Sequence, residues 1–450
     1  MIPAQPAAQQ IHLGLPIQDK RLNVYDLSPE QLAAHTQELG EPAYRARQVL
    51  HWLYKELVSD FAQMTNLPLG LRAKLAGTLK IGSAELVAQK ISSDGWTRKA
   101  LLRLRDGSTV EAVLMLYYDR ATVCISSQVG CAMGCTFCAT GQMGFTRNLS
   151  SGEIVEQVIW FNRWLREHPH TPVDDRGGRY AGGRTKGEGR KGPNLDPLIQ
   201  NPKSKIQNQD PDAWFGGYEG RGERTQTITG VTNVVFMGMG EPLVNYKHLW
   251  GAIRTLNSPQ GLGLGARRLT VSTVGIVPGI RRFAQEDLAV NLAVSLHAPN
   301  DELRGSFMPI NLRYPVAELI EACREYVRAT HRRITFEYVL ISGVNDSLDM
   351  AAELRDRLRG LLCHVNLIPL NPVPGTGMKA TPREQVYAFQ KVLEDAGIHT
   401  TVRIERGVDI AAACGQLKVE EEPGSRRRTL NPELVQAHVL ADLAAHDAGE

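Results

Sequence analysis

Apolar residues follow two different spacings along the chain, and the spacing changes near residue 120. Apolar side chains stand three or four positions apart, as in amphipathic helices, within residues 27–39, 43–57 and 67–79. The next stretch alternates apolar and polar residues on both sides of Asp106-Gly107, a dipeptide typical of hairpin turns. We therefore predict a helical accessory domain followed by a β-hairpin over residues 25–120.

Beyond residue 120, short β-branched runs alternate with segments of helical periodicity. We predict strands at residues 121–126, 231–237, 267–273, 291–297, 334–340, 364–370 and 399–405. The first helical segment begins with the capping box Ser150-x-x-Glu153 and places Ile154, Val158 and Leu165 on one side. Repeated strand–helix–strand units favour parallel pairing with right-handed crossovers, hence an α/β barrel or an open α/β sheet over residues 121–420.

One segment interrupts this rhythm. Residues 167–224 are rich in Gly, Pro, Lys, Arg and Asn and show no periodicity, so they cannot bury enough apolar surface to order themselves. They lie between the first predicted helix and the second predicted strand, and we predict a disordered surface insertion there. Residues 1–24 are predicted as a flexible tail, and residues 421–450 as a C-terminal tail or helix.

Composition narrows the class of protein. The chain has 450 residues, of which 42% are hydrophobic, enough for a large core and two or three domains. It has no apolar run of membrane-spanning length, and the first ten residues do not resemble a secretion signal. Seven clustered rather than evenly spaced cysteines favour a reducing compartment, so we expect a cytoplasmic protein. A net charge of +3 permits an RNA partner, recognised through local basic patches.

Three cysteines carry the clearest chemical signal. Cys131, Cys135 and Cys138 have the spacing C-x3-C-x2-C on one short stretch. Four thiolates would complete a structural zinc site or an iron–sulfur cluster, whereas three leave one iron of a [4Fe-4S] cluster open to an outside ligand. Cys124 is the rival fourth ligand, but it lies in the preceding predicted strand. An incomplete zinc site and simple buried cysteines are the alternatives.

The spacing of these cysteines is the signature of radical S-adenosylmethionine (SAM) enzymes, and the wider sequence resembles one family of them. That family comprises the bacterial dual-specificity RNA methyltransferases, which modify C2 of an adenosine in 23S rRNA and in tRNA. The similar stretches are QVGCAMGCTFCATGQMGFTRNL, MGMGEPLVNY, SLHAPND, LIPLNPVPG and DIAAACGQL. The resemblance covers nearly all the chain outside the N-terminal tail and the insertion. It implies a partial (β/α)6-type radical SAM barrel, preceded by the helical domain and hairpin.

The same motifs fall at the carboxyl ends of the predicted strands, where ligands bind in α/β folds. By resemblance, Cys131, Cys135 and Cys138 hold the [4Fe-4S] cluster, and the methionyl group of SAM occupies the open iron. The resemblance places Gly240 and Glu241 near the SAM ammonium group. It assigns the SAM carboxylate, ribose and adenine to Ser272, Ser295, Leu296, His297 and Asn371.

The resemblance also implies a mechanism, because adenine C2 is electron-poor and a bad nucleophile. Cys414 matches a cysteine that first receives a methyl group from SAM. A 5′-deoxyadenosyl radical then removes hydrogen from that methyl group, and the methylene radical adds to C2. Cys124 matches the thiol that resolves the covalent protein–RNA adduct, and Glu111 matches a proton acceptor. Either Glu111 or Cys124 could take the C2 proton, and the sequence does not choose between them.

The implied partners are 23S rRNA, tRNA and an electron donor such as flavodoxin or ferredoxin; we expect a monomer that does not bind membranes. Arginines beside a motif or a strand end are candidate phosphate contacts: Arg147, Arg267, Arg268, Arg304, Arg332, Arg333, Arg403 and Arg406. Two other functions stay open. One is C8 methylation by a related resistance-type enzyme, and the other is a non-catalytic iron–sulfur RNA-binding protein, which would have no use for Cys414.

Overall fold

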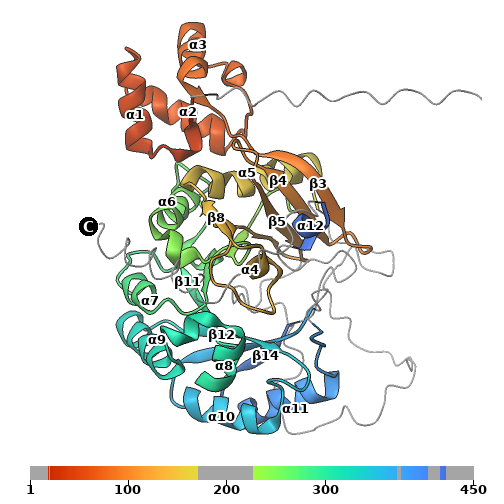
Figure 1. Ribbon diagram of the computed structural model, residues 1–450. Coiled ribbons are helices and arrows are strands. Elements are labelled where there is room, and N and C mark those ends of the chain that lie inside the picture. Colours follow the sequence, from red (N-terminus) through yellow and green to blue (C-terminus); the bar gives the residue numbers. More distant parts are fainter. Residues whose placement is uncertain (1–18, 20, 171–226, 372–376, 404–415, 422–450) are drawn as a thin grey trace, which may run out of the picture.

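A single ten-stranded sheet organises the chain, in the order β14-β13-β12-β11-β10-β9-β6-β5-β4-β3 (Figure 1). The structure is a computed structural model that describes residue 19 and residues 21–170, 227–371, 377–403 and 416–421. The strands of the sheet are β3 (Glu85–Ile91), β4 (Thr97–Arg103), β5 (Thr109–Leu116), β6 (Ala121–Cys124), β9 (Asn233–Phe236), β10 (Leu269–Thr273), β11 (Asn291–Ser295), β12 (Ile334–Leu340), β13 (Cys363–Pro369) and β14 (Thr400–Val402).

Seven of these strands, from β6 through β9 to β14, pair in parallel, as predicted for residues 121–405. The hairpin at Asp106-Gly107 is also confirmed, with β4 and β5 antiparallel on either side of it. β5 continues into the parallel sheet because Val113 pairs with Cys124 of β6. Among the described strands β14 and β3 stand at the two edges, so the α/β sheet is an open, partial barrel with an antiparallel extension.

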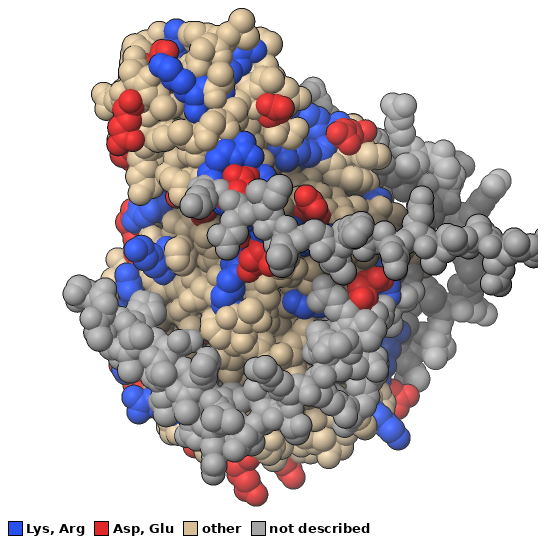
Figure 2. Space-filling view, turned by 45° about the horizontal axis from the view of Figure 1, so that its top comes forward, with Lys and Arg blue, Asp and Glu red and all other residues tan. Residues whose placement is uncertain are grey.

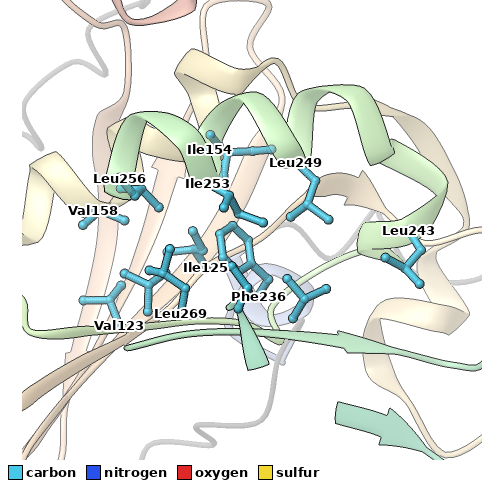
Figure 3. Packing of buried hydrophobic residues seen from close by; sticks show 14 of the residues in the cluster. Val123, Ile125, Ile154, Val158, Phe236, Leu243, Leu249, Ile253, Leu256 and Leu269 are labelled. Atoms are coloured by element: carbon cyan, nitrogen blue, oxygen red, sulfur yellow. The ribbon is translucent and has the colours of Figure 1, made fainter. Parts of the chain in front are cut away.

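Strand β6 shows why the sheet has two different faces. Val123 and Ile125 point to one side and are fully buried, whereas Cys124 and Ser126 point to the other, as a period of two requires. On the first side, helices α5 (Ser151–Glu167) and α6 (Tyr246–Asn257) cover the sheet. Figure 3 shows Ile154 of α5 packed with Val123 and Ile125 in one cluster of buried apolar side chains. The second side is left for polar chemistry.

The remaining helices lie around this sheet and in an N-terminal module (Figure 1). The module contains α1 (Pro29–Glu38), α2 (Tyr44–Tyr54) and α3 (Leu69–Thr78), with β1 (Leu22–Asn23) paired to β2 (Leu79–Lys80). The others are α4 (Ala139–Met143), α7 (Val277–Phe283), α8 (Asp301–Phe307), α9 (Val316–Thr330), α10 (Leu348–Leu358), α11 (Arg383–Glu394) and α12 (Gln416–Glu421). No helix in the described part of the chain is long and apolar enough to cross a membrane.

Helix α5 joins the N-terminal module to the sheet. It begins at the predicted capping box, in which Ser150 and Glu153 each bond the other's backbone N–H. The carboxylate of Asp26 accepts a hydrogen bond of 2.6 Å from the backbone N–H of Gly152. A Cβ at Gly152 would lie 2.7 Å from that carboxylate, so only glycine permits this contact. Arg163 donates to the carbonyl oxygen of Val58 at 2.6 Å, which fixes a second point of the module.

The predicted insertion lies between α5 and β9. The backbones of His170 and Ile228 pair through two hydrogen bonds of 2.9 and 2.8 Å, so the chain leaves and re-enters this part of the fold at one place. Residues 171–226 lie outside the described residues, as do most of the predicted tails. The boundaries predicted for these segments therefore stay predictions. On the face in Figure 2, basic and acidic side chains are interspersed.

Candidate active site at the carboxyl ends of the parallel strands

The three cysteines lie on one loop, between β7 (Gln128–Gly130) and α4. β8 (Phe145–Asn148) pairs with β7 and closes the loop, and the backbone N–H of Cys131 donates to the carbonyl oxygen of Gly144 at 2.8 Å. Gly130 has a φ of +77°, and a Cβ there would lie 1.9 Å from that same oxygen. Glycine at 130 is thus a steric requirement of the turn that presents Cys131.

Contacts with neighbouring strand ends hold the loop in place. The side chain of Gln128 accepts a hydrogen bond of 2.9 Å from the backbone N–H of Glu241 and donates one of 2.8 Å to Asn148. Phe137, between the second and third cysteines, meets the ring of His297 edge to face, with 5.1 Å between the ring centres. The loop therefore packs directly against residues that follow β9 and β11.

Burial sets the chemistry of the cysteine thiols. Cys131 and Cys135 are buried, and burial raises the pKa of the Cys135 thiol to about 12 and that of Cys131 well above its usual value. Nearby Cys138 raises both pKa values further, whereas the Arg304 guanidinium lowers that of Cys135. Thiols in such a place become thiolates when a bound cation compensates their charge.

In the described part of the chain, no three His, Cys, Asp or Glu side chains are placed so that they could hold a metal ion together. The donor set nevertheless fits an iron–sulfur cluster, because three neighbouring thiols on one loop are the ligands that such clusters take, and Cys131 and Cys135 are buried away from competing water. A cluster at this place would be held by Cys131, Cys135 and Cys138.

A cavity of about 240 Å³ lies at the carboxyl ends of the parallel strands. It brings together five of the residues predicted to bind SAM: Gly240, Glu241, Ser272, Ser295 and His297. The other residues that line it are Phe236, Met237, Gly238, Pro242, Thr273, Val274, Glu337, Val339, Ile368 and Arg403.

Two predicted SAM residues do not line this cavity. Leu296 is fully buried, and its backbone N–H donates to the carbonyl oxygen of Glu337 at 3.0 Å. Its side chain therefore belongs to the core, and only its backbone supports the strand end. Asn371 is half-buried, at the end of a described segment, and is not among the lining residues.

Glu241 is a buried carboxylate that organises two strand ends. Its two oxygens accept hydrogen bonds from the backbone N–H groups of Leu243, at 3.0 Å, and Val274, at 2.8 Å. Burial raises the pKa of Glu241 to about 7, while these hydrogen bonds and one from Thr273 oppose the rise. The carboxylate can therefore change its charge near neutral pH.

His297 has a defined protonation state. Its backbone φ is +59°, a left-handed conformation that turns the chain back after β11. Burial lowers its pKa to about 3, with a smaller contribution from Arg304, so the ring is neutral at physiological pH. Nδ1 accepts a hydrogen bond of 3.1 Å from the backbone N–H of Val339, which leaves the ring proton on Nε2 as a donor.

Arg304 corrects one sequence-based expectation. It was a candidate phosphate contact, but its side chain is fully buried. The guanidinium donates to the carbonyl oxygens of Leu296 at 3.0 Å and Val274 at 2.6 Å, and to the side chain of Asn311 at 3.0 Å. Its donors are thus used to join the ends of β10 and β11, and they are not available to RNA.

The predicted reactive residues on β5 and β6 also lie together. Glu111 stands two residues from Val113, which pairs with Cys124, so the two side chains share a face as diagonal neighbours. Cys124 belongs to a small cluster with Val113, Met115, Tyr117 and Val235, against which Met237 of the cavity wall packs. One face of the sheet therefore runs from Glu111 through Cys124 to the cavity.

Helix α12 brings the C-terminal part of the chain to this face, as Figure 1 shows beside β5. The backbone N–H of Lys418 donates to a Glu111 oxygen at 2.7 Å, and Lys99 forms a buried ion pair with the other oxygen at 2.9 Å. Cys414 lies outside the described residues, two positions before α12 begins.

Two family models match the chain. Residues 22–81 match the ribosomal RNA large subunit methyltransferase N-terminal domain, and residues 223–354 match the radical SAM superfamily. A probable dual-specificity RNA methyltransferase RlmN of Roseiflexus castenholzii is 46% identical over 420 residues, which are 90% of this chain and 98% of that protein. The chain belongs to the RlmN family. The RlmN protein of Chloroflexus aurantiacus is 47% identical over 88% of this chain and 92% of its own length.

A solved structure agrees with this assignment. The crystal structure of a radical SAM methyltransferase from Sphaerobacter thermophilus is 46% identical, covers 88% of this chain and 98% of its own, and has a TM-score of 0.73. At 46% identity, the two proteins are similar in sequence as well as in fold. The radical SAM match at residues 223–354 begins at the end of the predicted insertion and does not include the cysteine loop.

Two site residues escaped the sequence analysis. Lys99, the buried partner of Glu111, lies in the hairpin, where alternating charges are usually solvated. Glu337 lies in the cavity wall, and its signal was visible: a lone acidic residue within the apolar run ITFEYVL. A charge in a strand otherwise buried on both faces requires a partner or a ligand.

Proposed function

We propose that this chain is a radical SAM methyltransferase that forms 2-methyladenosine in 23S rRNA and in tRNA. Its relatives are dual-specificity RNA methyltransferases, which supports RNA as the substrate. The observation that carries the proposal is the contact between Glu111 and Lys418, because it ties the segment that follows Cys414 to the face that holds Cys124.

Cys131, Cys135 and Cys138 would hold a [4Fe-4S] cluster, and the cavity beside them would hold SAM. When bound, this pair supplies an electron and a 5′-deoxyadenosyl group that can remove a hydrogen atom. The cavity residues would bind SAM and orient it. Neutral His297 offers its Nε2 proton as a donor, and Glu241 and Arg304 keep the strand ends at fixed positions.

The proposed carrier of the carbon atom is Cys414. Its thiolate attacks the SAM methyl group, and the S-methyl group formed then loses a hydrogen atom and bonds to adenine C2. The adduct gives up the C2 proton, which Glu111 or Cys124 accepts, and one electron, which would return to the [4Fe-4S] cluster. Cys124 then attacks the Cys414 sulfur. A disulfide forms, and the carbon leaves with the electron pair of its bond to sulfur and takes up a proton to become the methyl group.

The finer properties follow from this chemistry. An electron donor such as flavodoxin or ferredoxin would reduce the cluster, and a dithiol would reduce the disulfide after each turnover. The target adenine must leave its stack, at a cost on the order of a few kcal/mol, which favours loops of rRNA and tRNA. We propose a monomer that acts in the cytoplasm.

Nucleoside mass spectrometry tests the proposal. The protein is reconstituted anaerobically with iron and sulfide, and 23S rRNA fragments and tRNA are digested after reaction with SAM and a reductant. The proposal predicts 2-methyladenosine from the wild-type protein and none from Cys414→Ala. Formation of 8-methyladenosine would favour the C8 enzyme, and RNA that is bound but unmodified would favour the non-catalytic binding protein.

A further inference from the structure

The cavity wall contains a buried carboxylate that the proposed mechanism does not use. Glu337 lies in β12, lines the cavity, and is 4% exposed. Its Oε2 accepts a hydrogen bond of 2.8 Å from the side-chain N–H of Asn366. Its Oε1 is buried and has no hydrogen-bond partner among the described residues. A buried carboxylate oxygen without a donor is costly, so a ligand that supplies one would be stabilised here.

A chain of hydrogen bonds runs from the surface to this carboxylate. Its links are His399 Nδ1 to His364 Nδ1 at 2.8 Å, His364 Nε2 to Thr401 Oγ1 at 2.9 Å, and Thr401 Oγ1 to Asn366 Oδ1 at 3.3 Å. Asn366 Oδ1 can only accept, so Thr401 donates to it and accepts from His364 Nε2. His364 Nδ1 is then an acceptor, and His399 is the donor.

Every donor in this chain points toward Glu337. The chain therefore ends on Oε2 and fixes the plane of the carboxylate, and Oε1 is left as the buried acceptor of a residue that lines the cavity. Burial raises the pKa of Glu337, whereas the charge of Arg403 and the bond from Asn366 lower it. Arg403 also lines the cavity, so the part of the cavity that contains Glu337 already includes a positively charged side chain.

The position of Glu337 distinguishes among the donors of SAM. Glu241 is the acidic group that acts on Cys131 and Cys135, so it marks the end of the cavity nearest the proposed cluster, where the charged methionyl group belongs. Glu241 follows β9, and Glu337 lies three strands away on β12, so Glu337 is remote from the methionyl end. The donors of SAM beyond the methionyl end include the two neutral hydroxyl groups of the ribose.

We propose that Glu337 Oε1 accepts a hydrogen bond from the ribose hydroxyl groups of SAM. This inference rests on the proposed function, in which the cavity takes SAM. Asn366, Thr401 and His364 act as positioning residues, because they hold the carboxylate and are not among the residues that line the cavity.

Anaerobic titration calorimetry on the reconstituted full chain tests the proposed ribose contact. The readout is binding affinity and not activity. The ligands are S-adenosylhomocysteine and its 2′-deoxy and 3′-deoxy forms. For the wild type, loss of the bonded hydroxyl should weaken binding about tenfold or more, the usual effect of one hydrogen bond to a charged group. Glu337→Gln should bind the parent ligand about tenfold more weakly and lose little more with the deoxy ligand. Glu384→Gln, an exposed change on α11, should behave as wild type.

The outcomes separate this inference from the proposed function. If the wild type binds none of the ligands, the SAM site itself is wrong. If it binds all three ligands equally, the ribose contact is overturned while the SAM site stands, and no variant is needed for this result. Equal loss of affinity for parent and deoxy ligands in Glu337→Gln would also overturn it, since Glu337 would then recognise another part of the ligand.

Discussion

The backbone N–H of Lys418 donates a hydrogen bond of 2.7 Å to the carboxylate of Glu111, across 307 residues of sequence. The same carboxylate accepts from the ammonium group of Lys99 at 2.9 Å, and both side chains are almost fully buried. Glu111 is therefore a structural tie between α12 and the sheet as well as the candidate proton acceptor.

Glu111→Gln should separate these two roles. The amide can still accept from Lys418, but the buried Lys99 ammonium group loses its carboxylate partner, so we expect a loss of about 3–5 kcal/mol in the free energy of unfolding. Adding Lys99→Met removes that cation and should restore most of the stability, measured by urea denaturation. The stable double variant should still fail to methylate RNA. If it regains full activity, Glu111 is not the proton acceptor and Cys124 takes that role.

Cys124→Ala should trap the protein on RNA. The variant can still form the bond between the carbon on Cys414 and adenine C2, but it lacks the thiol that attacks the Cys414 sulfur. We expect a protein–RNA adduct that survives a denaturing gel and disappears after nuclease treatment. Cys323→Ala, a core position on α9, is the matched control and should give no adduct. A Cys124→Ala sample without adduct, but with normal turnover, would assign resolution to another group.

Arg304→Lys should destabilise the protein although it keeps the charge. An ammonium group cannot reproduce the planar donors that reach Leu296, Val274 and Asn311, so buried acceptors lose their partners, at a cost of about 2–4 kcal/mol in unfolding free energy. Arg313→Lys, at an exposed position, should have little effect. The salt dependence of RNA binding should not change with either variant. A stable Arg304→Lys protein with a shallower salt dependence would restore Arg304 as a phosphate contact.

Glu241 should make stability depend on pH. Its pKa is about 7 in the folded protein against 4.5 for an ordinary Glu, so the folded state binds the proton more tightly. The resulting stabilisation is present below pH 4.5 and is lost as the pH rises through 7, a change on the order of 3 kcal/mol. The unfolding free energy of the cofactor-free wild type, minus that of Glu241→Gln, should fall across this range. Parallel pH curves for the two proteins would contradict this origin.

Much of the fold could be predicted because its signals are local. The β-branched run at residues 121–126 indicated a strand, Asp106-Gly107 indicated the hairpin, and the Ser150 capping box indicated the start of α5. The motifs fell at strand ends, and parallel strands bring such ends to one edge. For that reason five of the predicted SAM residues line one cavity.

Long-range polar contacts could not be predicted in the same way. Arg304 follows a motif and looks like a surface cation in the sequence, but α8 turns its side chain into the protein, where strand-end carbonyls accept its donors. The pairing of Lys99 with Glu111 and Lys418 depends on where the C-terminal helix returns to the sheet. No local periodicity records that return, since it is fixed by packing between distant segments.

Isotope transfer from SAM to RNA tests the central claim most directly. SAM with a fully deuterated methyl group is supplied to the reconstituted protein, and the 2-methyladenosine formed is weighed by mass spectrometry. If the carbon passes through Cys414 as described, one deuterium is removed before the carbon reaches C2, and the product methyl group keeps only two. A product that keeps all three deuterium atoms would mean direct methyl transfer and would contradict the account.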